Sequence, residues 1–213
     1  MKIIIVAGGP EEKHPDFSCF PVKDSIWVGV DRGVYHLLKK GIKPHYAFGD
    51  FDSLNSSEKE WMSSYELPLF EYDSEKDKTD LELALEWAVA EQPERILLVG
   101  ATGGRLDHEL ANIQLLLMGL EHRVPIEILD CQNSISLRAP GTYEAVNERE
   151  YPYLSFLPFN GPVAGFSLYG FKYPLKNQHL AMGSTLCISN ELVNKSGTYS
   201  FSDGILMFIK SHD

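Results

Sequence analysis

The 213-residue sequence contains no long hydrophobic run. The first apolar run, Ile3 to Ala7, is far too short for a signal peptide, and no later run approaches the roughly 18 residues that cross a bilayer. We therefore expect no membrane association and a cytoplasmic location. Cysteine is also scarce, because Cys19, Cys131 and Cys187 lie far apart and form no CxxC pair. This pattern favours reduced thiols over a disulfide framework or a zinc site.

Excess positive charge and the common nucleotide-binding motifs are lacking as well. The net charge of −11 argues against a protein that binds nucleic acid by neutralising phosphates. The GxxxxGK[ST] motif of P-loop proteins is absent, and Gly8-Gly9 is too sparse for the GxGxxG dinucleotide fingerprint. Any nucleotide site in this chain must therefore be built in another way.

The first part of the sequence alternates short β-branched runs with segments of helical periodicity. The expected strands are 2–7, 25–30, 46–48, 95–99 and 126–129, and the expected helices are 33–40, 56–65, 79–91 and 106–121. This order predicts an open, mostly parallel, Rossmann-like α/β sheet.

Two of the expected helices carry apolar residues at intervals of three and four. In 79–91 these residues are Leu81, Ala84, Leu85, Ala88 and Val89. In 106–121 they are Leu106, Leu110, Ile113 and Leu117. The spacing predicts that both sets face the core.

The pattern changes after Cys131, where helical periodicity ends. Short runs at 151–157, 163–169, 185–189 and 205–210 are separated by glycine and proline, which is typical of an all-β domain. We therefore predict an α/β domain over 1–132 and a small β-sandwich or barrel over 133–213.

The acidic segment Gly49 to Ser53 directly follows the expected strand 46–48. Asp50 and Asp52 are two residues apart, so in an extended chain both carboxylates point to one side. Two like charges held that close are costly without a cation, and Mg²⁺ prefers oxygen ligands of this kind. The alternative is a solvated turn that is rich in aspartate.

A second acidic group, Asp73, Asp77 and Asp80, precedes the helix at 79–91. Capping explains carboxylates at a helix start without a ligand, and Thr79 to Glu82 is a candidate capping box. A metal ligand at Asp80 is attractive because this residue opens the next α/β unit on the same sheet edge. Lys78 is placed to meet a phosphate or to balance local charge.

Two more segments lie at strand-to-helix junctions. The glycines of Gly100 to His108 allow backbone N–H groups and a helix N-terminus to face an anion. Within it, Arg105 is suited to bind a phosphate, and Asp107 with His108 to orient or deprotonate a hydroxyl. The segment Asp31-Arg32-Gly33 would contact a nucleotide or cap its helix. A glycine-rich turn with a capping aspartate is the alternative for Gly100 to His108.

Taken in order, these segments and Ser189-Asn190-Glu191 in the β-rich tail resemble bacterial thiamine pyrophosphokinases. The resemblance spans nearly the whole chain. It implies an N-terminal domain that binds ATP and Mg²⁺ and a C-terminal β-sandwich that binds thiamine. It also implies a homodimer whose thiamine sites lie where domains and subunits meet.

The resemblance also implies roles for individual residues. Asp50, Asp52 and Asp80 look like the metal cluster, and together with Asp107 they form the expected catalytic set. The expected nucleotide and phosphate contacts are Asp31, Arg32, Gly33, Asp77, Lys78, Thr79, Gly103, Gly104, Arg105 and His108. Ser189 and Asn190 look like residues of the thiamine pocket.

The reaction implied is attack of the thiamine hydroxyl on the β-phosphorus of ATP, which gives thiamine diphosphate and AMP. The alternatives are a Mg²⁺-dependent nucleotide hydrolase, a kinase acting on another alcohol, and a nucleotide-binding regulatory module.

Overall fold

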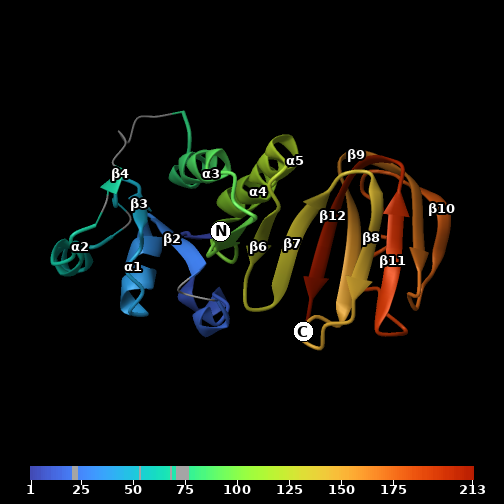
Figure 1. Ribbon diagram of the computed structural model, residues 1–213, viewed down its shortest axis with the longest axis horizontal. Coiled ribbons are helices and arrows are strands. Elements are labelled where there is room, and N and C mark those ends of the chain that lie inside the picture. The colour runs from blue at the N-terminus through green and yellow to red at the C-terminus, as the bar shows by residue number, and fades with distance from the viewer. Residues whose placement is uncertain (21–23, 53, 68, 71–76) are drawn as a thin grey trace. The chain divides into compact units, whose positions relative to one another are not determined.

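The computed structural model describes residues 1–20, 24–52, 54–67, 69–70 and 77–213, with only the backbone at 69–70. Ser53 and Asp73 of the predicted acidic segments lie outside the described residues. The chain divides into two compact units, Met1–Cys131 and Gln132–Asp213, and each is described by itself. Helices occur in the first unit and strands in both, which gives an α/β fold (Figure 1). No helix of the described chain is long and apolar enough to cross a membrane.

Within the residues that the structure describes, the first unit is built on six parallel strands. They are β1 (Lys2–Val6), β2 (Ser25–Val30), β3 (Tyr46–Phe48), β4 (Leu69–Phe70), β5 (Arg95–Val99) and β6 (Ile126–Leu129). Their order in the sheet is β4-β3-β2-β1-β5-β6, and every neighbouring pair is parallel. Five of these strands were predicted. Strand β4 was missed because two residues carry no readable periodicity.

The helices follow the predicted order. They are α1 (Arg32–Lys39), α2 (Ser56–Ser63), α3 (Asp80–Ala90), α4 (Leu106–Leu115) and α5 (Leu117–His122), with short 3-10 turns η1 (Glu11–Lys13) and η2 (Phe17–Cys19). The helix predicted over 106–121 is two helices. Leu116 N donates to Ile113 O, and Gly119 N donates to Leu116 O, so each bond spans three residues. This tightened turn separates α4 from α5.

The core of the first unit lies against the central strands. Ile3, Ile4, Ile5 and Val6 of β1 are fully buried, as expected for a parallel strand covered on both faces. All five apolar residues predicted on α3 are buried, which confirms that stripe. The stripe predicted over 106–121 is wrong at Leu106, which is 67% exposed, and at Leu110, which is 54% exposed, whereas Ile113 and Leu117 are partly buried. The described residues of the first unit leave Leu106 and Leu110 uncovered.

The second unit consists of antiparallel strands. They are β7 (Asn133–Arg138), β8 (Gly141–Val146), β9 (Tyr153–Tyr169), β10 (Leu175–Leu180), β11 (Ser196–Phe201) and β12 (Asp203–Ser211). The order is β7-β12-β9-β11-β8, and β10 also pairs with β9.

Two predictions in this unit were wrong, namely the break between the runs 151–157 and 163–169 and the strand at 185–189. The runs 151–157 and 163–169 belong to one 17-residue strand, β9, which has positive φ angles at Asn160, Gly161 and Gly165. These residues let the strand bend without ending. The run 185–189 is a loop, because Ile188 N donates to Thr185 O in a local turn.

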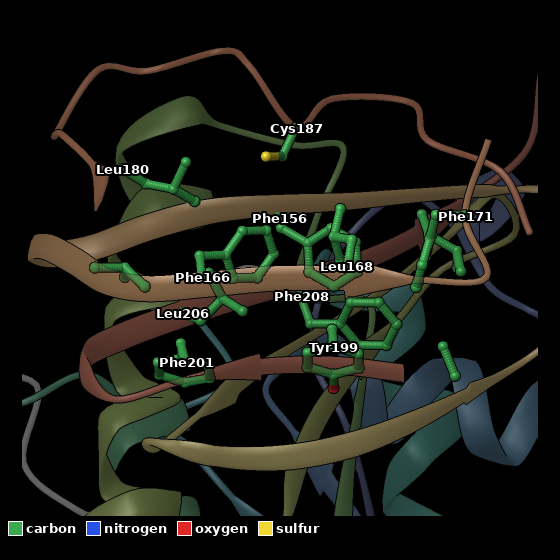
Figure 2. Packing of buried hydrophobic residues seen from close by; sticks show 13 residues of the cluster. Phe156, Phe166, Leu168, Phe171, Leu180, Cys187, Tyr199, Phe201, Leu206 and Phe208 are labelled. Atoms are coloured by element: carbon green, nitrogen blue, oxygen red, sulfur yellow. The ribbon is translucent and has the colours of Figure 1, made fainter. Parts of the chain in front are cut away.

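Aromatic residues fill the core of the second unit (Figure 2). The ring of Phe156 lies between 5.0 and 5.7 Å, centroid to centroid, from those of Phe166, Phe171, Tyr199 and Phe208. Such pairs contribute about 0.5–1.5 kcal/mol each beyond the burial of their area. These residues come from β9, β11, β12 and the segment after β9, so the cluster ties these elements together.

Candidate active site

The predicted segments of the first unit lie along one edge of its sheet. Parallel strands all end at the same edge, so the residues that follow β2, β3 and β5 lie along that edge, with β1 between β2 and β5. The chain runs outward from β1 through β2 and β3 to β4, and then returns to place β5 on the other side of β1. Open α/β sheets bind ligands at such a reversal, outside the carboxyl ends of the strands.

Asp31 and Gly49 come together where β2 and β3 end. Val30 pairs with Phe48 in the parallel register, and Asp31 N donates to Phe48 O at 2.9 Å. Gly49 has a φ of 129°, and a Cβ on it would lie 2.1 Å from Asp31 Oδ1. A side chain at Gly49 would be strained by this φ and would displace the Asp31 carboxylate, and the register places Asp31 and Asp50 on adjacent strand ends.

The Asp50 to Asp52 segment is a turn, and the predicted extended conformation is wrong. Phe51 has a φ of 59°, and Asp52 N donates to Asp50 Oδ1 at 3.0 Å. Phe51 packs against the apolar cluster that contains Leu54 and Met62. Because Phe51 turns toward the core, its two neighbours are left on the surface, with Asp50 partly exposed and Asp52 exposed.

The start of α3 carries the next predicted residues. Thr79 caps the helix, with its side chain accepting from Glu82 N at 3.2 Å, and Asp80 is the first helical residue. Lys78 forms an ion pair with Glu86, which supports its charge-balancing role. Asp77 is exposed.

The packing of α3 sets the direction in which Asp80 lies. The ring of Trp87 is 4.6 Å from that of Tyr46 and 5.8 Å from that of Phe48, centroid to centroid. Asp80 lies seven residues before Trp87, roughly 10 Å along the helix axis. A helix that links two parallel strands runs opposite to them, so Asp80 lies toward the edge where Asp50 follows β3.

The donor chemistry of these residues fits Mg²⁺. Asp50, Asp52 and Asp80 offer only carboxylate oxygens, which are the ligands that this hard cation prefers. Asp31 Oδ1, at the neighbouring strand end, adds negative charge that a cation would neutralise. Among the residues that the structure describes, no three His, Cys, Asp or Glu side chains are already grouped to hold a metal ion.

The turn from Gly100 to Gly104 lies against the segment that follows β1. Gly9 N donates to Gly100 O at 2.8 Å, and a Cβ on Gly9 would lie 2.5 Å from that oxygen. Gly103 N donates to Glu109 Oε2 at 2.9 Å. The turn therefore already presents an N–H group to an anionic oxygen, which is the property needed to bind a phosphate.

The side chains that follow this turn are paired with each other. Arg105 donates to both carboxylate oxygens of Asp107, at 3.1 and 2.6 Å. Asp107 Oδ1 also accepts from His108 N at 3.0 Å. The hydrogen bonds from Arg105 lower the pKa of Asp107 to about 2. All three residues are exposed, and Asp107 is a weak proton acceptor in this arrangement.

Arg32 and Gly33, predicted as nucleotide contacts, have structural partners. A Cβ on Gly33 would lie 1.8 Å from Val6 O, so this glycine allows α1 to approach β1 closely. Arg32 forms an ion pair with Glu58, whose other carboxylate oxygen accepts from Asn55 N in the capping box of α2. The guanidinium is thereby fixed near the strand ends.

Ser189 and Asn190 occupy the loop before β11 in the second unit. Asn190 Oδ1 accepts from Tyr173 N at 3.1 Å and from Glu191 N at 2.9 Å, while its Nδ2 donates to Tyr173 O at 2.9 Å. Ser189 has a φ of 54°, and its N donates to Ser155 Oγ at 2.9 Å. Asn190 is buried, and Ser189 is exposed. Asn190 therefore fixes the loop, and Ser189 is the one of the two that faces outward.

Sequence reasoning missed three features of this sheet edge. Glu58 pairs with Arg32, Gly9 contacts the turn after β5, and Asp130 accepts from Thr102 Oγ1 at 2.9 Å with both residues buried. The Gly8-Gly9 pair was a usable signal, because it directly follows a strand. A lone buried aspartate such as Asp130 gives no sequence signal of its own.

Comparisons with known proteins agree along the whole chain. The family description "Thiamin pyrophosphokinase, catalytic domain" matches residues 21–128, and "Thiamin pyrophosphokinase, vitamin B1 binding domain" matches residues 144–206. The chain is 47% identical over 214 residues to thiamine pyrophosphokinase of Bacillus subtilis (strain 168), and the match covers 100% of each protein.

Solved structures give the same result. The thiamine pyrophosphokinase from Bacillus subtilis superposes with a TM-score of 0.96 at 45% identity, with 100% of both chains covered. That from Geobacillus thermodenitrificans gives 0.93 at 50% identity, covering 100% of this chain and 98% of the other. The resemblance found from the motifs is confirmed, and this chain belongs to the thiamin pyrophosphokinase family.

Proposed function

We propose that this protein is a thiamine pyrophosphokinase that transfers the pyrophosphoryl group of ATP to the hydroxyl of thiamine. The observation that carries the proposal is the full-length match to the Bacillus subtilis thiamine pyrophosphokinase in both sequence and fold. The predicted catalytic segments also follow strands that all end at one edge of the sheet. The products are thiamine diphosphate and AMP.

The finer fold assignment is part of the proposal. The six parallel strands and their reversal beside β1 support a Rossmann-like domain that binds ATP. The antiparallel strands of the second unit, with β9 bending between its partners, support a β-sandwich that binds thiamine. The family description that matches residues 144–206 is worded as a vitamin B1 binding domain, which supports the second assignment.

Asp50, Asp52 and Asp80 would hold Mg²⁺. Bound there, the ion would neutralise charge on the polyphosphate of ATP. The turn at Asp50 to Asp52 supports this role, because Phe51 packs inward and leaves both carboxylates at the surface.

The nucleotide would lie across the reversal between β1 and β5. The N–H groups of the turn that contains Gly103 and Gly104 would face the phosphates, and a phosphate oxygen would replace the Glu109 carboxylate that now accepts from Gly103 N. Arg105 would exchange Asp107 for a phosphate oxygen, since a guanidinium binds either group through two parallel bonds. The remaining contacts with the nucleotide would come from Asp31, Arg32, Gly33, Asp77, Lys78 and Thr79.

Positioning would supply most of the rate acceleration. The thiamine oxygen forms a bond to the β-phosphorus, the bond from that phosphorus to the α,β-bridging oxygen breaks, and AMP leaves with the electron pair. The hydroxyl proton passes to solvent or to a nearby base. Asp107 would hold Arg105 until a phosphate oxygen takes its place, and a carboxylate with a pKa of about 2 is a weak proton acceptor, so Asp107 is not the proposed base.

A homodimer with thiamine at the subunit interface is the proposed assembly. The support comes from α4, where Leu106 and Leu110 are exposed beside the phosphate-facing turn. Leu186 and Ile188, in the loop that leads to Ser189, are exposed as well. A contiguous exposed apolar patch marks a surface that a partner covers, and Leu106 and Leu110 lie one turn apart on the same side of α4. A second chain on these surfaces would lie next to both proposed binding sites.

The three free cysteines fit the proposed cytoplasmic location.

One assay tests the function. The purified protein is incubated with ATP, Mg²⁺ and thiamine, and the products are separated by chromatography. Equal amounts of AMP and thiamine diphosphate are expected. ADP with thiamine monophosphate would indicate ordinary kinase chemistry. Phosphate release in the absence of thiamine would indicate a hydrolase, and a lack of any turnover would indicate a binding module.

A further inference from the structure

Two histidines are buried beneath the strand ends of the first unit. His14, directly after η1, is 9% exposed, and His36 in α1 is 6% exposed. Their rings meet edge to face, with centroids 4.9 Å apart and an interplanar angle of 87°. The ring of His14 also stacks on Phe17 at 5.7 Å and 11°. These contacts fix the orientation of the His14 imidazole.

The fixed ring of His14 contacts two glycine segments at once. His14 Nε2 is 3.1 Å from Gly9 O, and Gly9 N donates to Gly100 O at 2.8 Å. A Cβ on Gly100 would lie 2.8 Å from His14 Nε2. Because Gly9 O can only accept, Nε2 must carry the proton. His14 therefore joins the segment after β1 to the turn after β5.

The second histidine extends this connection to α1. His36 lies on the helix that begins with Arg32 and Gly33, and Gly33 is packed against Val6 O at the end of β1. The histidine pair thus connects three segments of the sheet edge, namely those after β1, β2 and β5. All three belong to the proposed nucleotide site or contact it.

A role as simple filler does not explain these imidazoles. Within the described residues, His14 Nδ1 and both ring nitrogens of His36 have no hydrogen-bond partner. Buried polar atoms without partners are costly, and a leucine or phenylalanine would fill the space without that cost. Burial lowers the pKa of both rings, so both are neutral near pH 7. The hydrogen bond to Gly9 is what distinguishes His14 from an apolar residue.

We propose that His14 is a positioning residue of the nucleotide site, whose Nε2–H holds Gly9 against the Gly100 to Gly104 turn. This keeps the N–H groups of the turn in the geometry that faces the polyphosphate of ATP. The inference rests on the proposed function, because it assigns the turn to ATP. His14 itself contacts no reacting atom, so its loss would weaken ATP binding and leave the thiamine site intact.

Two substitutions of His14 separate positioning from packing. His14→Phe keeps a ring but removes the donor, whereas His14→Gln places an amide N–H near the position of Nε2. The matched control is His122→Phe, at the exposed end of α5. For each variant we would measure KM for ATP and for thiamine, kcat, the urea midpoint, and the Kd of a non-hydrolysable ATP analogue with Mg²⁺.

His14→Phe should raise the ATP KM and the analogue Kd about tenfold, with the thiamine KM changed by less than about twofold. His14→Gln should recover most of the loss, and His122→Phe should match the wild type. Equal effects on both substrates, or no recovery with glutamine, would overturn the proposal. If His14→Phe does not fold, His14→Leu, which also lacks the donor, takes its place and should raise the ATP KM selectively. A wild type that binds the analogue but makes no thiamine diphosphate would contradict only the proposed function, and the Kd series would still decide the role of His14.

Discussion

Helices α3 and α4 carry nearly the same apolar spacing, yet only α3 buries its stripe. Leu81 and Leu85 of α3 are 6% and 0% exposed, whereas Leu106 and Leu110 of α4 are 67% and 54% exposed. Both helices begin at the sheet edge that carries the proposed site. Periodicity thus identifies the apolar face of a helix, but it does not say what covers that face. For α3 the cover is the sheet of its own unit, and for α4 we propose a second chain.

Truncation of a buried leucine in α3 should give the largest effect. Leu85→Ala should lower the free energy of unfolding by about 4 kcal/mol, because it removes apolar contacts and leaves a cavity. Leu110→Ala is the matched control and should change it by less than about 0.5 kcal/mol under conditions that keep the chain monomeric. Urea denaturation measures both. Similar losses for the two variants would mean that α4 is covered within its own chain.

Helix α1 offers the opposite case, a polar ring that is buried. Burial, then the nearby charges of His14, Arg32 and Lys39, lower the pKa of His36 from 6.5 to about 4, against an opposing effect of Glu11. The unfolded state therefore binds a proton at a higher pH than the folded state does. The contribution of the neutral His36 ring to the free energy of unfolding is fully present above pH 6.5. It falls by about 3 kcal/mol as the pH drops from 6.5 to 4.

Urea denaturation of the wild type and of His36→Leu between pH 7 and pH 4.5 measures this contribution. The variant should lose less stability over the interval, because leucine does not titrate. Parallel curves for the two proteins would show that His36 is not the group responsible.

The first turns of α3 and α4 should differ in their effect on turnover. Asp80→Asn should reduce kcat about a hundredfold, because the amide is a poor ligand for Mg²⁺, while the urea midpoint changes little. Asp107→Asn should reduce kcat about tenfold or less, because Asp107 is proposed to orient Arg105 without accepting the proton. Steady-state assays across Mg²⁺ concentrations compare the two variants. A larger loss for Asp107→Asn would assign it the role of base.

A charged residue placed on the exposed stripe of α4 should have the smallest effect on folding. Its effect should be to weaken the association of two chains. Leu110→Glu is expected to leave the unfolding free energy of the monomer within about 0.5 kcal/mol and to weaken dimerisation at least about tenfold. Sedimentation velocity over a concentration series measures the dimer. An unchanged dimer would place the interface elsewhere, and a wild type that stays monomeric would remove the proposed role of α4.

The sequence predicted most of the first unit because local signals and tertiary packing agree there. The β-branched runs at 25–30, 95–99 and 126–129 became strands with the predicted bounds. Phe51 shows where this agreement fails, because its packing in the core turns the chain between Asp50 and Asp52. The prediction of two separate strands in place of β9 failed for a similar reason. The glycines that suggested a break allow one continuous strand to bend.

The sequence predicted which segments form the candidate site. It did not predict most of the contacts that their residues make. The junctions at Asp31, Asp50 and Gly100 do fall on one sheet edge, as their positions after strands predicted. The contact of His14 with Gly9, and the pairing of Arg32 with Glu58, join residues distant in the sequence or lacking a motif. Only the folded chain reveals such pairs.

The fate of the β-phosphorus of ATP tests the central claim most directly. ATP labelled at the β-phosphoryl group is incubated with the protein, Mg²⁺ and thiamine, and the labelled product is identified. We predict that the label moves into thiamine diphosphate while unlabelled AMP appears in equal amount. Recovery of the label in ADP would contradict transfer of a pyrophosphoryl group by this protein.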